Sequence, residues 1–160
     1  MARGARGGRP AGPRPRIQLV AALVGLVFLV VGALGFVPGV TTDYDQLAGA
    51  THHSGAKLFG VFQISILHNS VHLLFGLLGL AMARTIGAAR LYLAGGGAAY
   101  LALWLYGFAI HQDGAANFLP VNDNDNWLHL GLGFGMLTAG LLLSNQYGTG
   151  GRLDTPVDRP

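Results

Sequence analysis

The stretch SILHNSVHLLFGLLG, residues 65–79, is an apolar segment interrupted by two histidines, an asparagine and two serines. At about 100° per residue in a helix, most of its polar and small side chains fall on one stripe, about a third of the circumference wide. The rest of the helix surface is apolar. The stretch therefore predicts a helix that turns one polar stripe toward protein and apolar side chains elsewhere.

The composition predicts an integral membrane protein. Of the 160 residues, 51% are hydrophobic and only 11% are charged, and the mean hydropathy is +0.45. A soluble domain carries about 25% charged residues, whereas the apolar runs of this chain approach the roughly 20 residues that cross a bilayer. The chain has no cysteine, which excludes disulfides, thiolate metal sites and cysteine nucleophiles.

Four apolar segments are the predicted membrane spans, and the predicted fold class is an all-α, four-helix membrane bundle. The spans cover residues 17–37, 62–83, 91–110 and 127–143. The remaining residues at the two ends, 1–16 and 145–160, are rich in glycine, proline and polar residues and are predicted to be disordered tails.

The second apolar segment is longer than a span requires. Its apolar character extends back to residue 56, and a continuous helix over residues 56–83 would be about 42 Å long, against about 30 Å of hydrocarbon. We therefore expect its first two turns, around Lys57 and Gln63, to leave the membrane or lie in the interface, unless the helix tilts strongly.

Charge asymmetry predicts the orientation. The ten basic residues lie in the two tails and in the Arg84–Arg90 turn, with the single exception of Lys57. Four spans place both tails and that turn on one side, which the positive-inside rule identifies as the cytoplasm. We also expect the arginines of residues 1–16 to contact anionic lipid.

The polar stripe occurs twice. The pattern Asn-x-x-His-x-x-x-Gly begins at Asn69 and again at Asn126, in the second and fourth spans. Both spans run in the same direction, so the chain is predicted to contain two like-oriented hairpins, a parallel repeat about an axis along the membrane normal. The stripe, expected between the second and fourth helices, consists of Ser65, His68, Asn69, His72, Asn126 and His129.

Two stretches resemble a known family. They are LFGVFQISILHNSVHLLFGLLGL, residues 58–80, and NWLHLGLGFGML, residues 126–137. They resemble the bacterial four-span membrane family catalogued as domain of unknown function 4383, over residues 17–144. The resemblance implies a four-helix membrane fold in the bacterial inner (plasma) membrane, and it brings no activity and no functional residues.

The histidines inside the spans admit three hypotheses. In the first, neutral imidazoles and Asn69 hydrogen-bond between helices, and the protein is a non-catalytic structural or partner-binding membrane protein. In the second it is a redox or ligand protein, with haem held by His72 and His129 or a transition metal held by His68 and His72. In the third it is a small proton or solute transporter, although the spans contain no Asp, Glu, Lys or Arg.

Helix lengths argue against a shared site of His72 and His129. Counted from the cytoplasmic ends of the spans, His72 lies about 18 Å and His129 about 25 Å into the membrane. Helix capping by Asp125 or Asn126 is also predicted at the start of the fourth span. Asn126 would then differ from Asn69, which is expected deep in its helix.

The sequence contains none of the common catalytic motifs. There is no Gly-x-Ser-x-Gly, no P-loop, no His-Glu-x-x-His and no glutamate. The expected partners are therefore the lipid bilayer, a second copy of the chain in a homo-oligomer, and an unidentified protein that meets the outer loops. Nucleic acid is not expected as a partner.

Overall fold

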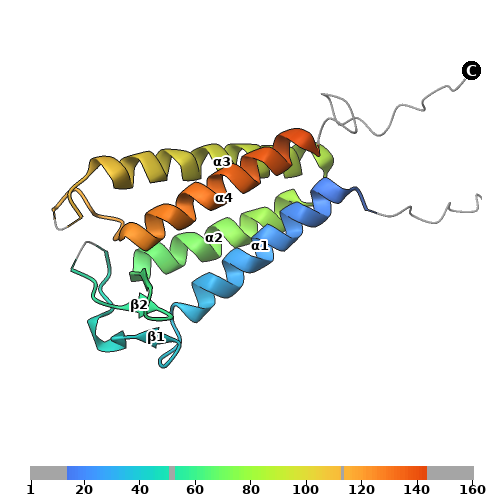
Figure 1. Ribbon diagram of the computed structural model, residues 1–160. Helices are drawn as coiled ribbons and strands as arrows, with labels where there is room; N and C mark the ends of the chain where they lie inside the picture. The colour runs from blue at the N-terminus through green and yellow to red at the C-terminus, as the bar shows by residue number, and fades with distance from the viewer. Residues whose placement is uncertain (1–13, 51–52, 113, 144–160) are drawn as a thin grey trace, which may run out of the picture.

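The computed structural model describes residues 14–50, 53–112 and 114–143, so the predictions for the two tails fall almost wholly outside the described residues. Four helices make up the fold, as predicted (Figure 1). They are α1 (Arg16–Leu34), α2 (Ile66–Met82), α3 (Ile86–Ala109) and α4 (Asp123–Leu142). The α1–α2 connection also contains a single turn of 3-10 helix and three two-residue strands, β1 (Thr41–Thr42), β2 (Lys57–Leu58) and β3 (Phe62–Gln63), in the antiparallel order β1-β2-β3.

The expectation of a continuous helix from residue 56 is wrong. The chain turns at Phe59 and Gly60, both with positive φ, and the flanking residues pair as β2 and β3. Helix α2 then begins only at Ile66, because the Ser65 hydroxyl accepts a hydrogen bond from the His68 N–H and caps the first turn. An apolar run shows neither the turn nor the cap, so hydropathy alone extends the helix too far.

The helices pack as two hairpins, α1 with α2 and α3 with α4 (Figure 1). Glycines bring the backbones together in both. A Cβ atom added at Gly25 in α1 would lie 2.9 Å from the carbonyl oxygen of Gly76 in α2. One added at Gly97 in α3 would lie 2.8 Å from the carbonyl oxygen of Gly133 in α4. Only glycine allows the two backbones to approach this closely. The two hairpins therefore have equivalent glycine contacts at corresponding positions.

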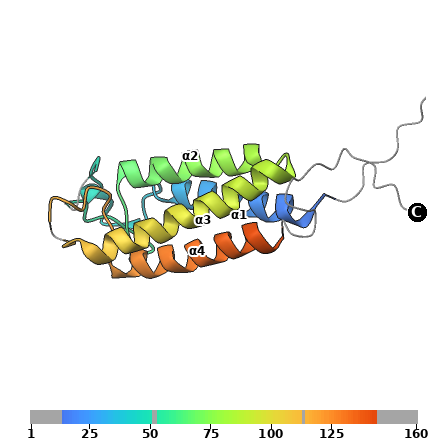
Figure 2. The ribbon, with the colours of Figure 1, turned by 90° about the horizontal axis from the view of Figure 1, so that it is seen from above.

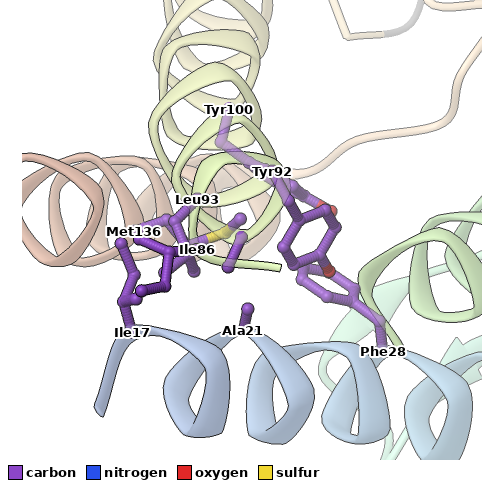
Figure 3. Close-up of a cluster of buried hydrophobic side chains, with 9 residues drawn as sticks. Ile17, Ala21, Phe28, Ile86, Tyr92, Leu93, Tyr100 and Met136 are labelled. Carbon is purple, nitrogen blue, oxygen red and sulfur yellow. The ribbon is translucent and has the colours of Figure 1, made fainter. Parts of the chain in front are cut away.

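The hairpins meet through α1 and α3. Figure 2 shows α3 crossing over α1, with α2 and α4 on opposite sides. Side chains of α1, including Ile17, Ala21 and Phe28, point toward Tyr92, Tyr100 and other core residues of α3, with Met136 of α4 beside them (Figure 3). The helices of the polar stripe, α2 and α4, make few direct contacts with each other, contrary to the expectation that they pack together.

The outer surface of the bundle is strongly apolar. Large hydrophobic side chains are exposed on every helix, for example Leu23 (61%), Leu74 (66%), Leu91 (66%) and Phe134 (63%). Two of the described helices, α1 and α3, are long and apolar enough to cross a membrane, and α2 is a shorter apolar helix. Polar side chains, by contrast, are among the most buried residues of the protein.

Candidate functional site

The two copies of the polar motif occupy the same places in their helices. Ser65 caps α2, and Asn122 caps α4 by accepting a hydrogen bond from the Asp125 N–H. Asn69 and Asn126 each follow their cap by four residues, and the two motif histidines follow it by seven. The prediction that Asp125 or Asn126 caps α4 is therefore wrong: Asp125 completes the capping box from inside the helix.

This alignment also removes the difference in depth that the sequence predicted for His72 and His129. His72 and His129 lie equally far from the N-terminal ends of their helices, about 10 Å at 1.5 Å per residue. Counted from the C-terminal ends of α2 and α4, the difference is about 4.5 Å, because α4 has 20 residues and α2 has 17. The two histidines can thus share one level of the bundle.

The asparagines of the motif pack on glycines of the preceding helix. A Cβ atom added at Gly35 would collide with the amide of Asn69, and one added at Gly107 would collide with the amide of Asn126. Both asparagines are buried, and Asn69 Nδ2 and Asn126 Oδ1 have no hydrogen-bond partner. The repeat therefore includes an asparagine–glycine contact in each hairpin, in addition to the residues of the sequence motif.

The histidines are held by aromatic contacts and a backbone carbonyl. The rings of His68 and His72 stack with centroids 4.6 Å apart and planes 28° apart. His72 Nδ1 donates to the carbonyl oxygen of His68 at 3.0 Å. His72 contacts Phe28, and His129 contacts Tyr100, each with ring centroids 5.3 Å apart.

All three histidines line one cavity of about 200 Å³ near the end of the bundle where α2 and α4 begin. Asn69 of α2 and Asp125 of α4 also line it. Its other walls are apolar and come from Val31 of α1, from α4 and from the segment of residues 58–64, including Leu58, Phe59 and Phe62. A neighbouring space of about 30 Å³ is lined by the same three histidines together with Tyr100 and Tyr106. The structure thus brings His68, His72 and His129 together although α2 and α4 do not pack on each other.

Two members of the predicted stripe do not line the cavity. Ser65 is fully buried as the cap of α2, and Asn126 lies against Gly107 of α3. In their place the cavity contains Asp125, which the sequence offered only as a cap. Its position in α4 corresponds to that of His68 in α2, three residues after the cap. That correspondence is the sequence signal that could have identified it.

Asp125 is buried and hydrogen-bonded. The backbone N–H groups of Gln63 and Asn122 donate to its Oδ2 at 3.0 and 2.9 Å. Burial raises the pKa of this carboxyl, which precedes the predicted span of residues 127–143, from 3.8 to about 7, and the two N–H groups oppose the shift. The group links α4 to strand β3 and is easily protonated near neutral pH.

The geometry does not fit the two cofactors considered from the sequence. Among the described residues, no group of three or more His, Cys, Asp or Glu side chains could hold a metal ion. The rings of His68 and His72 are nearly parallel and stacked, so their in-plane lone pairs do not converge on one point. The cavity, at about 200 Å³, is below the roughly 300–1,000 Å³ of drug-sized ligand sites and does not accommodate a haem.

Comparison with known proteins identifies one relationship. A family model described as "Domain of unknown function (DUF4383)" matches residues 18–142, which include most of α1, all of the other three helices and the residues that line the cavity. No curated protein and no solved structure matches the chain.

Proposed function

Since this chain belongs to the DUF4383 family, whose function is unknown, we propose its role from its geometry: a non-catalytic structural or partner-binding protein of the bacterial inner membrane. The observation that carries the proposal is the distribution of polarity. Large apolar side chains are exposed on all four helices, while polar side chains such as His68, Asn69 and His129 are buried. This arrangement suits a hydrocarbon solvent, in which polar groups are costly outside the protein interior.

Close helix packing supports the same role. In a membrane there is little hydrophobic driving force between helices, so association relies on close contact of small residues. Gly25 against Gly76 and Gly97 against Gly133 provide that contact in the two hairpins. The histidines in turn pack on Phe28 and Tyr100. Their contacts in the folded chain are those of packing residues.

The charges support an orientation with both termini in the cytoplasm. Arg14, Arg16, Arg84 and Arg90 lie at the end of the bundle where α1 and α3 begin. Asp43, Asp45 and Asp123 belong to the opposite end, with Lys57. Basic residues concentrate on the cytoplasmic side of membrane proteins, which places the cavity toward the outer face.

Single cysteines test both membrane residence and orientation, because the natural chain has none. We choose Asp45→Cys at the outer end and Gly87→Cys at the inner end, both exposed, the second with open space around the new side chain. A membrane-impermeant maleimide is expected to label Asp45→Cys on intact spheroplasts and Gly87→Cys only after permeabilisation. The cysteine-free parent is the control. The reverse pattern, or release of the protein from membranes by alkaline carbonate, would refute the proposal.

A second experiment addresses the non-catalytic, cofactor-free role. The protein is purified in mild detergent from cells supplemented with haem and metals, beside a His72→Ala/His129→Ala variant. We expect no Soret band and no stoichiometric metal in either sample, because the cavity is too small for haem and the ring planes do not converge. Absorbance or metal that is present in the parent and lost in the variant would make it a cofactor protein instead.

A further inference from the structure

The cavity contains buried polar atoms that the protein itself leaves without partners. His68, Asn69 and His129 are only 5%, 2% and 4% exposed. Their Nδ1, Nδ2 and Nδ1 atoms, respectively, have no hydrogen-bond partner, and all three residues line the 200 Å³ cavity. A buried polar group without a partner costs about 1–3 kcal/mol. Unpartnered polar groups around one space point to a ligand that hydrogen-bonds there.

Of the polar groups of the cavity, Asn69 Nδ2 is a hydrogen-bond donor, and those of His68, His72 and Asp125 include acceptors. His72 Nδ1 donates to a carbonyl, so the Nε2 atom of the neutral ring is an acceptor. His68 Nδ1 is unpartnered and accepts a hydrogen bond in the neutral tautomer that carries its proton on Nε2. Asp125 adds a carboxyl group whose two hydrogen bonds both go to Oδ2, so neither uses Oδ1. A ligand for this site must donate hydrogen bonds.

The charge of the cavity is also one-sided. Its lining residues include one acid, Asp125, and no lysine or arginine. The nearest basic residue in the sequence, Lys57, has an exposed side chain and does not line it. Because burial holds the Asp125 pKa near 7, the carboxyl is poised to ionise when a cation approaches. The electrostatics therefore favour a positive ligand.

The remaining walls of the cavity are apolar and favour a ligand with a compact apolar part. Leu128 and Leu132 of α4 form one side, and Phe62 of β3 with Phe59 of the turn before it forms another. Phe59 has φ +53°, a left-handed conformation that bulky residues rarely adopt. The turn thus holds an aromatic ring at the cavity at a cost in backbone strain. Aromatic faces also attract cations.

From these features we propose that the cavity binds a small organic molecule that carries a protonated amine on a compact apolar body. The amine donates to Asp125 and to the acceptor nitrogens of His68 and His72, and the apolar body lies against Phe59, Phe62 and Leu132. This binding site goes beyond the proposed structural role. The proposal does not depend on which way the protein is oriented in the membrane.

Titration calorimetry on the full chain in lipid nanodiscs tests the site, with empty nanodiscs as the reference for partitioning into lipid. Benzylamine is the probe. Benzyl alcohol has the same ring and a neutral hydroxyl, and benzyltrimethylammonium has the charge without an N–H donor. We expect saturable binding of benzylamine that exceeds the binding of both analogues, because only benzylamine supplies charge and donor together.

Matched variants assign the binding to the cavity. Asp125→Asn keeps an acceptor for the Gln63 and Asn122 N–H groups and removes the charge. We expect this variant to bind benzylamine at least about tenfold more weakly, because a hydrogen bond between charged groups is lost. The control is Asp123→Asn, an exposed acid two residues away, with a change of less than about twofold. His68→Gln against exposed His111→Gln forms a second pair with the same expectation.

Three outcomes would overturn the proposal. The first is the absence of saturable benzylamine binding, which a cavity filled only by water would give. The second is equal binding of benzylamine by the Asp125→Asn and Asp123→Asn variants. The third is binding of benzyl alcohol as tight as that of benzylamine. Thermal unfolding of each variant establishes that it is folded. The cysteine-labelling experiment has a separate readout, so failure of the site and failure of the membrane orientation are distinguishable.

Discussion

The ring of Phe28 stacks on the ring of Tyr100, with centroids 5.5 Å apart and planes 27° apart. Positions 28 and 100 are separated by the same number of residues as Gly25 and Gly97, so the two rings are equivalent members of the two hairpins. Each ring also contacts the motif histidine of its own hairpin. The stack therefore lies where the two halves of the repeat meet.

Removing either ring of this stack is expected to destabilise the protein strongly. Phe28→Ala and Tyr100→Ala should each cost about 3–5 kcal/mol of unfolding free energy, as buried aromatic truncations do. A double-mutant cycle should yield a coupling of about 0.5–1.5 kcal/mol for the stacked pair. The measurement is reversible unfolding in mixed detergent micelles. Phe108→Ala removes an exposed ring of α3 and is the control, and a comparable loss there would contradict the assignment of Phe28 and Tyr100 to the core.

Alanine at the glycines between paired helices should destabilise both hairpins. Gly25→Ala and Gly97→Ala place Cβ atoms against backbone of the partner helix, which cannot move aside, and overpacking of this kind costs about 1–3 kcal/mol. The same measurement on Gly131→Ala and Gly135→Ala, where the added atom meets nothing, should show unchanged or increased stability because alanine favours helix by about 1 kcal/mol. Equal effects at all four positions would argue against close packing.

The cap of α4 should contribute more than an ordinary helix start. Asn122 accepts from the Asp125 N–H, and its Nδ2 donates to the Val61 carbonyl next to β3. Loss of a cap costs about 1 kcal/mol, and Asn122→Ala also loses the bond to Val61. We therefore expect a loss of about 1–2 kcal/mol from this variant. Asn124→Ala, at an exposed position of the same helix turn, should change stability little in parallel thermal unfolding.

Stability should fall as pH rises through neutrality because of Asp125. The folded protein holds the pKa of this carboxyl at about 7, above its ordinary value of 3.8. Between these two values the folded protein binds more protons than the unfolded chain, so the stabilisation is complete below about pH 4 and is lost as pH rises through about 7. The three histidines line the same cavity and can add their own pH dependence.

Substitution isolates the contribution of Asp125 from that of the histidines. Asp125→Asn should flatten the decline in Tm between pH 5 and pH 8, whereas Asp123→Asn should retain it. If the two variants followed the same curve as the parent, burial of the Asp125 carboxyl would not control the pH response.

The sequence was sufficient to predict the helices and their repeat. Apolar runs indicated four helices, and the paired motifs beginning at Asn69 and Asn126 indicated equivalent hairpins. It also assigned His68, His72 and His129 to the protein interior, where they are found together. These features follow from local composition and spacing, which a single chain records directly.

Other features depend on contacts between distant residues. The strands over residues 57–63 depend on pairing with Thr41 and Thr42 and on a left-handed Phe59, neither of which has a local signature. The pairing of α1 with α3 depends on which face each apolar helix buries, and a helix that is apolar on all sides does not reveal it. Asp125 was taken for a cap because its burial results from the approach of Gln63.

The pairing of the helices also bears on how such a chain can be divided. Each hairpin has its own glycine contacts, and the connection between the hairpins is the short turn from Ala83 to Thr85. A cut in that turn would leave both pairs of helices whole and would part the rings of Phe28 and Tyr100 onto separate polypeptides. The molecule is therefore suited to reconstitution from two co-expressed fragments.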